Sequence, residues 1–458
     1  MSSPLVSQPT GLAPAAFLEN CRRLVGLDST PGHGNLAAAE FAGQLCESAG
    51  LHVEYQRESV EGLDQCNVIA RPQKEIPPRE VLFQTHLDTF DPGHFSHWTM
   101  TQANPFNASI YKDVMYGLGT ADVKLDFLCK LEAMKEFARK AMRTPFVLVG
   151  SFGAQSGAAG AIKLIRRKKI NAVHAFVGEP TQMKLVVAEK GFAVVEIRLP
   201  FSPEEVAYRR DHDLSESASS QSRMFSGKSV HSAAHESAIT KMLTYISQLP
   251  EGIALMDIDG GISHSSIPLS AVLEVDPVAG FKDPVLPKIS RVYQSLLVLE
   301  KELQEFRDEG FDPPFATVNV GMIRTSATEV TMTGCCRLPP SVTDAVYESW
   351  MKKLQRAVEA VGATFRVTDY RKGFTVEAQS DFVRATQEIL SQMGLDAGLH
   401  KTTAATEASV LNRLGIECLV WGPGQSVGNS HAPNESIKIG DLKAATEFYR
   451  RSLERFCL

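Results

Sequence analysis

The chain of 458 residues has a net charge of −6, is 43% apolar and 22% charged, and so resembles an ordinary globular protein long enough for two domains. The acidic balance, and the lack of a Lys/Arg run beyond residues 166–169, argue against a nucleic-acid partner. Nowhere do about 20 apolar residues follow one another, which argues against a membrane span.

The N-terminus and the cysteines favour a cytoplasmic protein. Residues 1–17, MSSPLVSQPTGLAPAAF, lack the basic start and the apolar run of a secretory signal. The eight cysteines are scattered, and no pair has the spacing of a zinc finger or a redox motif. We therefore expect free, mostly buried thiols in a cytoplasmic chain.

Helical and strand patterns alternate in the first part of the chain. Amphipathic helices are expected at residues 14–25, at 36–49, after Asp122, and at 158–165. Apolar strands are expected at residues 67–70, 81–84, 146–152 and 172–177. Strands that alternate with helices predict an α/β layer with a mostly parallel sheet flanked by helices.

The middle of the chain has a different texture. It contains a Ser-rich stretch at 209–222, a helix at 238–249, and a helical run from Val292 to Phe306. That run has the spacing of a coiled-coil seam, but it is short, which favours a core-facing helix. The α/β texture returns after residue 379, with a strand at 417–421 and a last helix.

This order predicts a discontinuous domain. An α/β domain formed by residues 1–191 and 376–458 would be interrupted by an inserted α+β domain at residues 192–375.

Two motifs in the first half place candidate ligands at element ends. VLFQTHLDT ends an apolar strand on His86, and Asp88 follows at the position of a carboxylate that would hold the second imidazole nitrogen. YGLGTADVK places Asp122 before a helix, where it is either a cap or a metal-bridging carboxylate. A dinucleotide site is disfavoured because the third glycine of that fingerprint is absent. A lone His at a strand end is more often an ordinary polar residue.

Two later motifs complete the set. AFVGEPT ends a strand at Glu179, and the loop WGPGQSVGNSHAPNES brings His431, Asn434 and Glu435 after another strand. The carboxyl ends of parallel strands collect ligands at one edge of a sheet. Imidazoles and carboxylates gathered from separate strand ends form the donor set that zinc prefers.

The ordered series THLD, GLGTAD, GEPT, KG (190–191), GKSVH (227–231), GPG and HAPNE resembles the zinc metallopeptidase and aminoacylase family. That family includes acetylornithine deacetylase, succinyl-diaminopimelate desuccinylase and carboxypeptidase G, and the resemblance covers nearly the whole chain. It implies a catalytic α/β domain with an inserted lid domain through which members often dimerise. We therefore expect a homodimer that takes a small-molecule carboxylate as substrate or ligand.

The resemblance also implies a metal centre. His86, Asp122 and Glu179 would hold a first zinc ion, Asp122 would bridge to a second ion that His431 also binds, and Asp88 would orient His86. A Glu at position 179 is typical of members that act on N-acyl amino acids or as carboxypeptidases.

Further roles are implied for residues that would touch the substrate. His231 resembles a lid histidine that steadies the tetrahedral oxyanion in a neighbouring subunit, and Arg337 resembles an arginine that grips the substrate carboxylate. A solvated histidine and a surface arginine remain the alternatives. Asn434, close to His431, is a candidate substrate-binding residue.

The acidic motif of the family is missing. Its pattern Asp-Glu-Glu-x-Gly reads Gly-Ala154-Gln155-Ser-Gly here, and residues 137–178 contain no Asp or Glu. In the family the first Glu is the general base for the metal-bound water, worth about 10² to 10⁴ in rate. The second Glu is a ligand of the second metal, and a neutral Gln155 predicts weak binding there. We expect one zinc ion, with a second bound weakly and with cobalt or manganese as substitutes.

Two functions remain open. The first is a zinc-dependent hydrolase of the amide bond in N-acyl amino acids or small peptides, with weak or lost activity. Glu407, Glu435, a metal-bound hydroxide or the substrate's own carboxylate would then replace the base. The second is a pseudoenzyme that binds a small carboxylate ligand or a protein partner. The joint loss of both acids favours the second.

Overall fold

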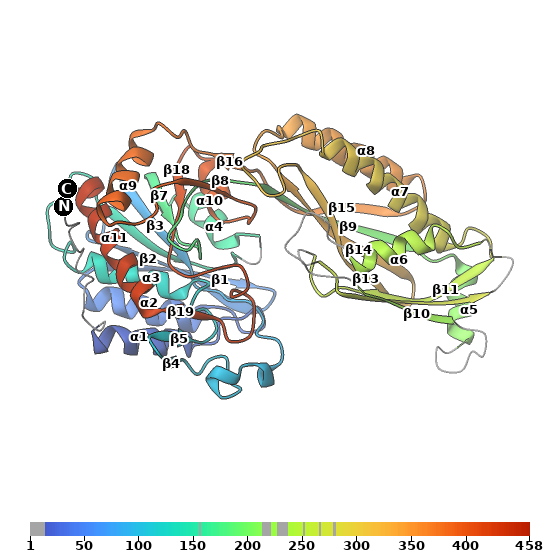
Figure 1. Cartoon of the computed structure of the whole chain (residues 1–458), viewed down its shortest axis with the longest axis horizontal. Helices are drawn as coiled ribbons and strands as arrows, with labels where there is room; N and C mark the ends of the chain where they lie inside the picture. Colours follow the sequence, from blue (N-terminus) through green and yellow to red (C-terminus); the bar gives the residue numbers. More distant parts are fainter. Residues whose placement is uncertain are drawn as a thin grey trace, which may run out of the picture. The chain divides into compact units, whose positions relative to one another are not determined.

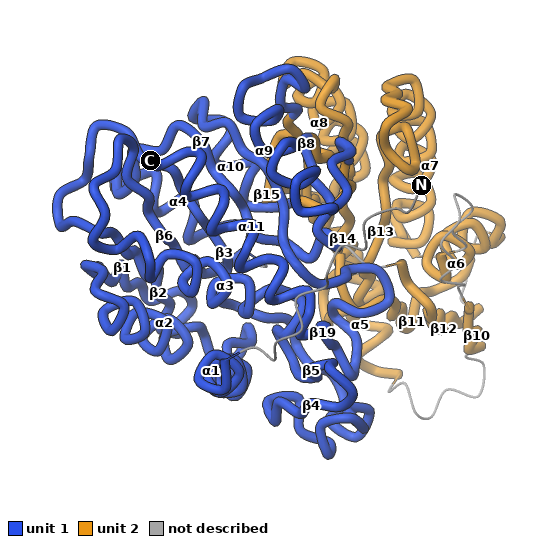
Figure 2. Tube along the Cα trace, turned by 60° about the vertical axis from the view of Figure 1, so that its left-hand side comes forward, with its two compact units in different colours: residues 1–187, 375–400, 406–458 blue, residues 188–374, 401–405 orange. Residues whose placement is uncertain are grey.

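The computed structural model describes residues 14–458, apart from 155–156, 213–220, 227–236, 251, 265–266 and 278–280. The chain divides into two compact units (Figures 1 and 2). Unit 1 consists of Met1–Val187, Thr375–His400 and Thr406–Leu458, and unit 2 of Ala188–Phe374 and Lys401–Ala405.

Unit 1 is built on a nine-stranded sheet in the order β1-β2-β6-β3-β7-β18-β8-β16, with β17 paired to β8. The strands are β1 (His52–Val60), β2 (Leu63–Arg71), β3 (Glu80–His86), β6 (Phe146–Ser151), β7 (Ala172–Val177), β8 (Leu185–Glu189), β16 (Phe374–Thr375), β17 (Leu399–Thr402) and β18 (Glu417–Val420). The central strands β6, β3, β7 and β18 are parallel, whereas β1, β2 and β8 pair antiparallel. The sheet is therefore mixed, with the predicted parallel arrangement at its centre.

Helices flank this sheet (Figure 1). They are α1 (Ala15–Val25), α2 (Leu36–Ser48), α3 (Lys124–Met134), α4 (Ala159–Arg166), α9 (Asp381–Gln392), α10 (Ala408–Asn412) and α11 (Ile439–Cys457). Every residue of β3 is buried, as a central strand covered on both faces requires. In the described part of the chain, no helix combines the length and the apolar character that crossing a membrane requires. All eight cysteines are free and buried, which confirms the expectation for the thiols.

A small three-stranded sheet joins two distant loops of unit 1. It contains β4 (Ser109–Tyr111), β5 (Val114–Tyr116) and β19 (Ser436–Lys438), and β19 pairs antiparallel with β5. Ser436 lies opposite Tyr116 in this pairing. The turn that leads to Asp122 is thereby fixed beside the loop that carries His431.

Unit 2 contains a seven-stranded antiparallel sheet in the order β10-β12-β11-β13-β14-β9-β15. Its strands are β9 (Gly191–Pro200), β10 (Gln221–Ser226), β11 (Ile253–Gly260), β12 (Ser270–Pro277), β13 (Thr317–Thr325), β14 (Glu329–Leu338) and β15 (Thr364–Arg371). Its helices are α5 (Pro203–Asp211), α6 (Ala238–Ile246), α7 (Val285–Leu303) and α8 (Asp344–Glu359). Figure 1 shows α6, α7 and α8 on one face of the sheet. Val292, Leu296 and Leu299 of α7 are buried in the core, so the run is a core-facing helix. The predicted fold class is confirmed.

A buried ion pair supports the strand ends of unit 1. Lys130 and Asp126 of α3 are 2.7 Å apart with fully buried side chains. The Lys130 ammonium also donates to the carbonyl of Gln84 at 2.6 Å and to the hydroxyl of Thr85 at 2.8 Å. The Tyr449 hydroxyl donates to Asp126 at 2.5 Å. Because Thr85 precedes His86, this network holds the end of β3 in place.

Removing the ammonium should therefore destabilise unit 1. We expect Lys130→Met to lower the free energy of unfolding by about 3–5 kcal/mol, because Asp126 would be left as an uncompensated buried charge. Urea unfolding followed by tryptophan fluorescence measures the loss. The control is Lys135→Met, which removes a half-exposed lysine near the same helix and should cost less than about 0.5 kcal/mol. Equal losses in the two variants would contradict this account.

Candidate metal centre

Three side chains of unit 1 meet at the carboxyl edge of the central strands. His86 is the last residue of β3, Asp122 lies just before α3, and Glu179 follows β7. One ligand atom from each lies within 4.8 Å of the other two. His86 is 2% exposed, Asp122 is 8% exposed, and Glu179 is half-buried. The structure thus brings together the three residues predicted to hold the first ion.

Asp122 lies between the two candidate histidines. One of its carboxylate oxygens, Oδ2, is 2.6 Å from Nε2 of His431, and the other, Oδ1, is 3.3 Å from Nε2 of His86. Oδ1 is buried and has no hydrogen-bond partner among the described residues. A buried acceptor without a partner costs about 1–3 kcal/mol, which coordination of a cation would recover. This donor set of imidazoles and carboxylates fits a divalent metal ion.

The hydrogen bond of Nδ1 determines which nitrogen of His86 could bind a metal ion. Nδ1 is 3.0 Å from the backbone carbonyl oxygen of Asp88 and 3.6 Å from its carboxylate. Because a carbonyl only accepts, Nδ1 carries a hydrogen and donates it, so Nε2 is the nitrogen that an ion at Asp122 would bind. Asp88 thus lies where the sequence predicts, but its backbone is the nearer acceptor.

The charges around His86 are strongly negative. Burial alone would lower the pKa of the His86 imidazole, but Asp122, Asp88 and Glu179 raise it well above its usual value. Burial would likewise raise the pKa of Asp122, yet His431 and His86 hold it well below its usual range. The carboxylates that favour a proton on His86 would favour a divalent cation in its place.

The His431 loop is held by its neighbours. The ring of His431 contacts that of Phe90 and is 44% exposed as a side chain. The Asn434 amide accepts from the backbone N–H of Met100 at 2.9 Å and donates to the hydroxyl of Thr99 at 3.1 Å. It also donates to the carbonyl of His97 at 3.3 Å. The amide is therefore engaged within unit 1, and its substrate-binding role stays a prediction.

Glu435 has a structural task that the sequence did not reveal. Its side chain is 1% exposed and accepts from the backbone N–H groups of Ala121 at 2.8 Å and Asp122 at 2.9 Å. Burial, followed by the nearby charge of Asp122, raises the pKa of Glu435 to about 8. Glu435 therefore holds the turn that presents Asp122. The sequence showed that Glu435 lies close to the candidate ligand His431, but not that its side chain binds the backbone at Asp122.

Glu407 belongs to a second buried network. It is 1% exposed and accepts from the amide of Gln84 at 2.7 Å and from the hydroxyl of Ser151 at 2.5 Å. Its other oxygen has no hydrogen-bond partner among the described residues, and burial raises its pKa. Gln84 precedes His86 by two residues and so shares its face of β3. A single Gln two residues before His86 in an apolar strand was the sequence signal for this buried polar network.

The remaining candidates lie elsewhere or outside the described residues. Ala154 is described, and its backbone N–H donates to the carboxylate of Asp88 at 3.4 Å. Arg337 lies in unit 2 on β14. Gln155 and His231 fall outside the described residues.

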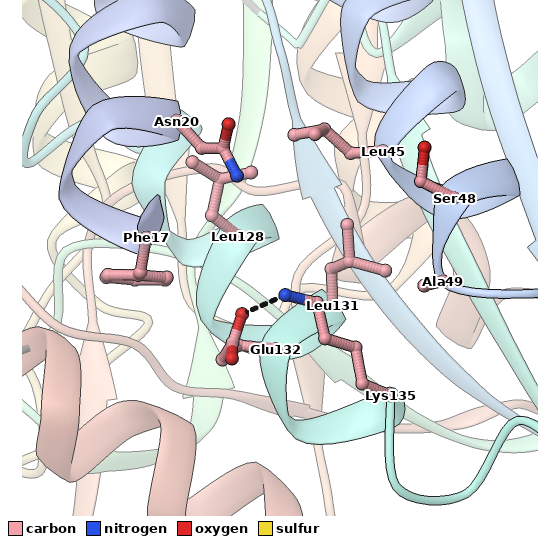
Figure 3. A pocket seen from close by; sticks show the side chains of 9 residues that line it. All are labelled: Phe17, Asn20, Leu45, Ser48, Ala49, Leu128, Leu131, Glu132 and Lys135. Carbon is pink, nitrogen blue, oxygen red and sulfur yellow. Dashed lines mark hydrogen bonds and ion pairs between the residues drawn. The ribbon is translucent and has the colours of Figure 1, made fainter. Parts of the chain in front are cut away.

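A separate cavity of about 410 Å³ lies between α1, α2 and α3 (Figure 3). Phe17, Leu45, Leu128 and Leu131 are part of its lining, and Glu132 pairs with Lys135 at its edge. Its lining contains no histidine or cysteine. This cavity is therefore distinct from the candidate metal centre.

Comparison with known proteins shows the family of the chain. Residues 82–455 match the model of the peptidase family M20/M25/M40. Acetylornithine deacetylase from Myxococcus xanthus is 24% identical over 446 residues, which cover 95% of this chain and 96% of that protein.

Solved structures share the fold. Aminoacylhistidine dipeptidase from Vibrio alginolyticus has a TM-score of 0.60 at 15% identity and covers 98% of each chain. An M20 family metallo-carboxypeptidase from Sulfolobus solfataricus has a TM-score of 0.61 at 16% identity, covering 96% of this chain and 99% of that one. Because the family match spans most of the chain and the motif series predicted the same group, the protein belongs to the peptidase family M20/M25/M40.

Proposed function

We propose that the protein holds a divalent metal ion, preferably zinc, at His86, Asp122 and Glu179. We further propose that it is a deacylase or peptidase scaffold for N-acyl amino acids or small peptides whose hydrolytic turnover is weak or lost. The observation that carries the metal proposal is the buried Asp122 oxygen without a partner between two imidazoles. When bound, such an ion supplies Lewis-acid chemistry, polarising an amide carbonyl and lowering the pKa of water.

The chain's own residues would prepare the site. The Asp88 carbonyl fixes the tautomer of His86, and Glu435 fixes the backbone of Asp122. His431 contributes a second imidazole to Asp122 and would bind a second ion together with Gln155. A neutral Gln155 neutralises none of the ion's charge, so we propose one well-bound ion.

Loss of the base would limit turnover. Ala154 has no group that accepts a proton. The two acids considered as replacements, Glu407 and Glu435, are each 1% exposed and each accept at least two hydrogen bonds. Their engagement favours a second candidate function, a pseudoenzyme that binds a small carboxylate or a protein partner.

Location and assembly are further parts of the proposal. A cytoplasmic location is supported by eight free, buried thiols, because disulfides are rare in that compartment. Dimerisation through residues 192–375 rests on the resemblance, and its test is the mass of the protein in solution.

Metal content tests the first proposal. We expect protein purified without chelators to retain about one zinc ion per chain by elemental analysis. Asp122→Asn should weaken zinc binding at least about 10-fold, because it removes the charge shared by both histidines. Asp381→Asn, which neutralises an exposed carboxylate of unit 1, is the matched control and should bind as the parent does. Equal zinc binding by the two variants would sink the proposal, as would a parent protein that binds no zinc.

Restoring the two acids tests the second proposal, that turnover is weak or lost because the base is missing. The double substitution Ala154→Glu with Gln155→Glu should raise kcat/KM for N-acyl amino acids at least about 10² fold in the presence of zinc, because it returns a general base. The control is Ala154→Gln with Gln155→Glu, which has nearly the same shape but no base at position 154. Rapid hydrolysis by the unmodified protein, or the same rate in both variants, would show that the base is not what limits turnover.

A further inference from the structure

Three side chains of unit 2 form a row across neighbouring strands. Phe192 of β9 lies opposite Arg337 of β14 on one side and opposite Arg371 of β15 on the other. Residues directly opposite each other in an antiparallel pair project from the same face of the sheet. Arg337, Phe192 and Arg371 are called the arginine row below.

The arginine row lies on the face away from the helices. Ala193 and Val195 of β9 pack in the core formed with α6, α7 and α8, and alternate residues point the other way. Phe192 and Val194 instead form a separate small cluster with Cys335. Packing against the helices of unit 2 therefore does not account for the two arginines.

Both guanidinium groups lie over one aromatic ring and keep an unused donor. The Cζ atom of Arg337 is 4.4 Å from the Phe192 ring centroid, and that of Arg371 is 5.5 Å away. The Nη1 of each is buried and without a hydrogen-bond partner among the described residues. Arg371 as a whole is only 7% exposed. Buried donors of this kind are costly unless an acceptor arrives.

The described carboxylates near the arginine row do not hydrogen-bond to the Nη1 group of either arginine. Asp369 pairs with Nε and Nη2 of Arg371 at 3.1 Å, which leaves Nη1 free of it. Glu189 is fully buried and acts electrostatically on Arg337. Lys190 adds a further positive charge close to Arg337, although its ammonium donates to the carbonyls of Pro313 and Phe315. Asp312 and Asp308 in turn act on Lys190, so the case for an anion rests on the two Nη1 groups without a partner among the described residues and not on net charge.

His264 does not add a positive charge at neutral pH. Its ring centroid is 5.9 Å from that of Phe192. Burial and then Arg337 lower the pKa of His264 below its usual value; Asp369 opposes them, and Arg371 has a smaller lowering effect. It is therefore a neutral polar neighbour of the arginine row.

We propose that the arginine row binds a dicarboxylate ligand, an N-acyl derivative of aspartate or glutamate. Arg337 binds one carboxylate of this ligand and Arg371 binds the other. The choice of an N-acyl amino acid as the ligand rests on the proposed function. The new element is Arg371, which we assign as a specificity-determining residue. Neighbouring strands are about 4.8 Å apart, so the backbones of the two arginines are separated by about 10 Å across β9. Because each arginine keeps its own buried Nη1 without a partner among the described residues, a ligand with two acceptor groups can satisfy both.

The test compares two ligands of nearly equal shape that differ in one charge. N-acetylglutamate and N-acetylglutamine are titrated calorimetrically into the full-length zinc-loaded protein. We expect N-acetylglutamate to bind at least about 10-fold more tightly, because a charge-assisted pair with Arg371 is lost in the amide. Arg371→Gln should bring the two affinities to within about 2-fold while leaving N-acetylglutamine binding unchanged.

Two further variants separate the role of charge from that of folding. Arg371→Lys keeps the charge and should retain part of the preference, whereas Arg366→Gln, which removes an exposed arginine of the same strand, should retain all of it. Equal affinities in the parent protein, no binding of either ligand, or an unchanged preference in Arg371→Gln would each overturn the proposal. Since binding and not turnover is measured, selective binding without hydrolysis agrees with the weak or lost turnover proposed above. A protein that binds zinc but shows no preference between the two ligands would contradict only the arginine-row proposal.

Discussion

The site in unit 1 is organised around the buried carboxylate of Asp122, which lies between two imidazoles. An ionised group with 8% exposure is costly unless it is paired and hydrogen-bonded. His86 reaches it from the end of β3, and His431 reaches it from a loop more than half the chain away, held by the pairing of β5 with β19. Glu435 binds the backbone of the same turn. Segments far apart in sequence are thus fixed around a single charge.

We propose that metal binding and proton transfer are separable in this site. The candidate ligands and the groups that orient them are present together, whereas position 154 has only a methyl group. The remaining acids, Glu407 and Glu435, are buried in hydrogen-bond networks that shape the site. The chain belongs to the M20/M25/M40 family. We propose that the alanine at position 154 separates its chemistry from the hydrolytic pattern that the motif series resembles.

The sequence predicted features that depend on local pattern and on motif order. The strand ending at His86, the helix after Asp122 and the core-facing helix α7 follow from apolar spacing. The hairpin of β1 and β2 was missed because β1 is largely polar, although the Glu61–Gly62 loop, with both residues at positive φ, was a hairpin signal. The Asp88 carbonyl as acceptor and the placement of Arg371 beside Phe192 depend on backbone direction and strand register, which no local pattern specifies.

The most direct measurement is anomalous diffraction at the zinc edge from crystals grown with zinc. We expect an anomalous peak for a zinc ion coordinated by Nε2 of His86 and by oxygens of Asp122 and Glu179, at about 2.0–2.2 Å from each. Zinc found only at other positions, with these three side chains turned apart, would contradict the central claim.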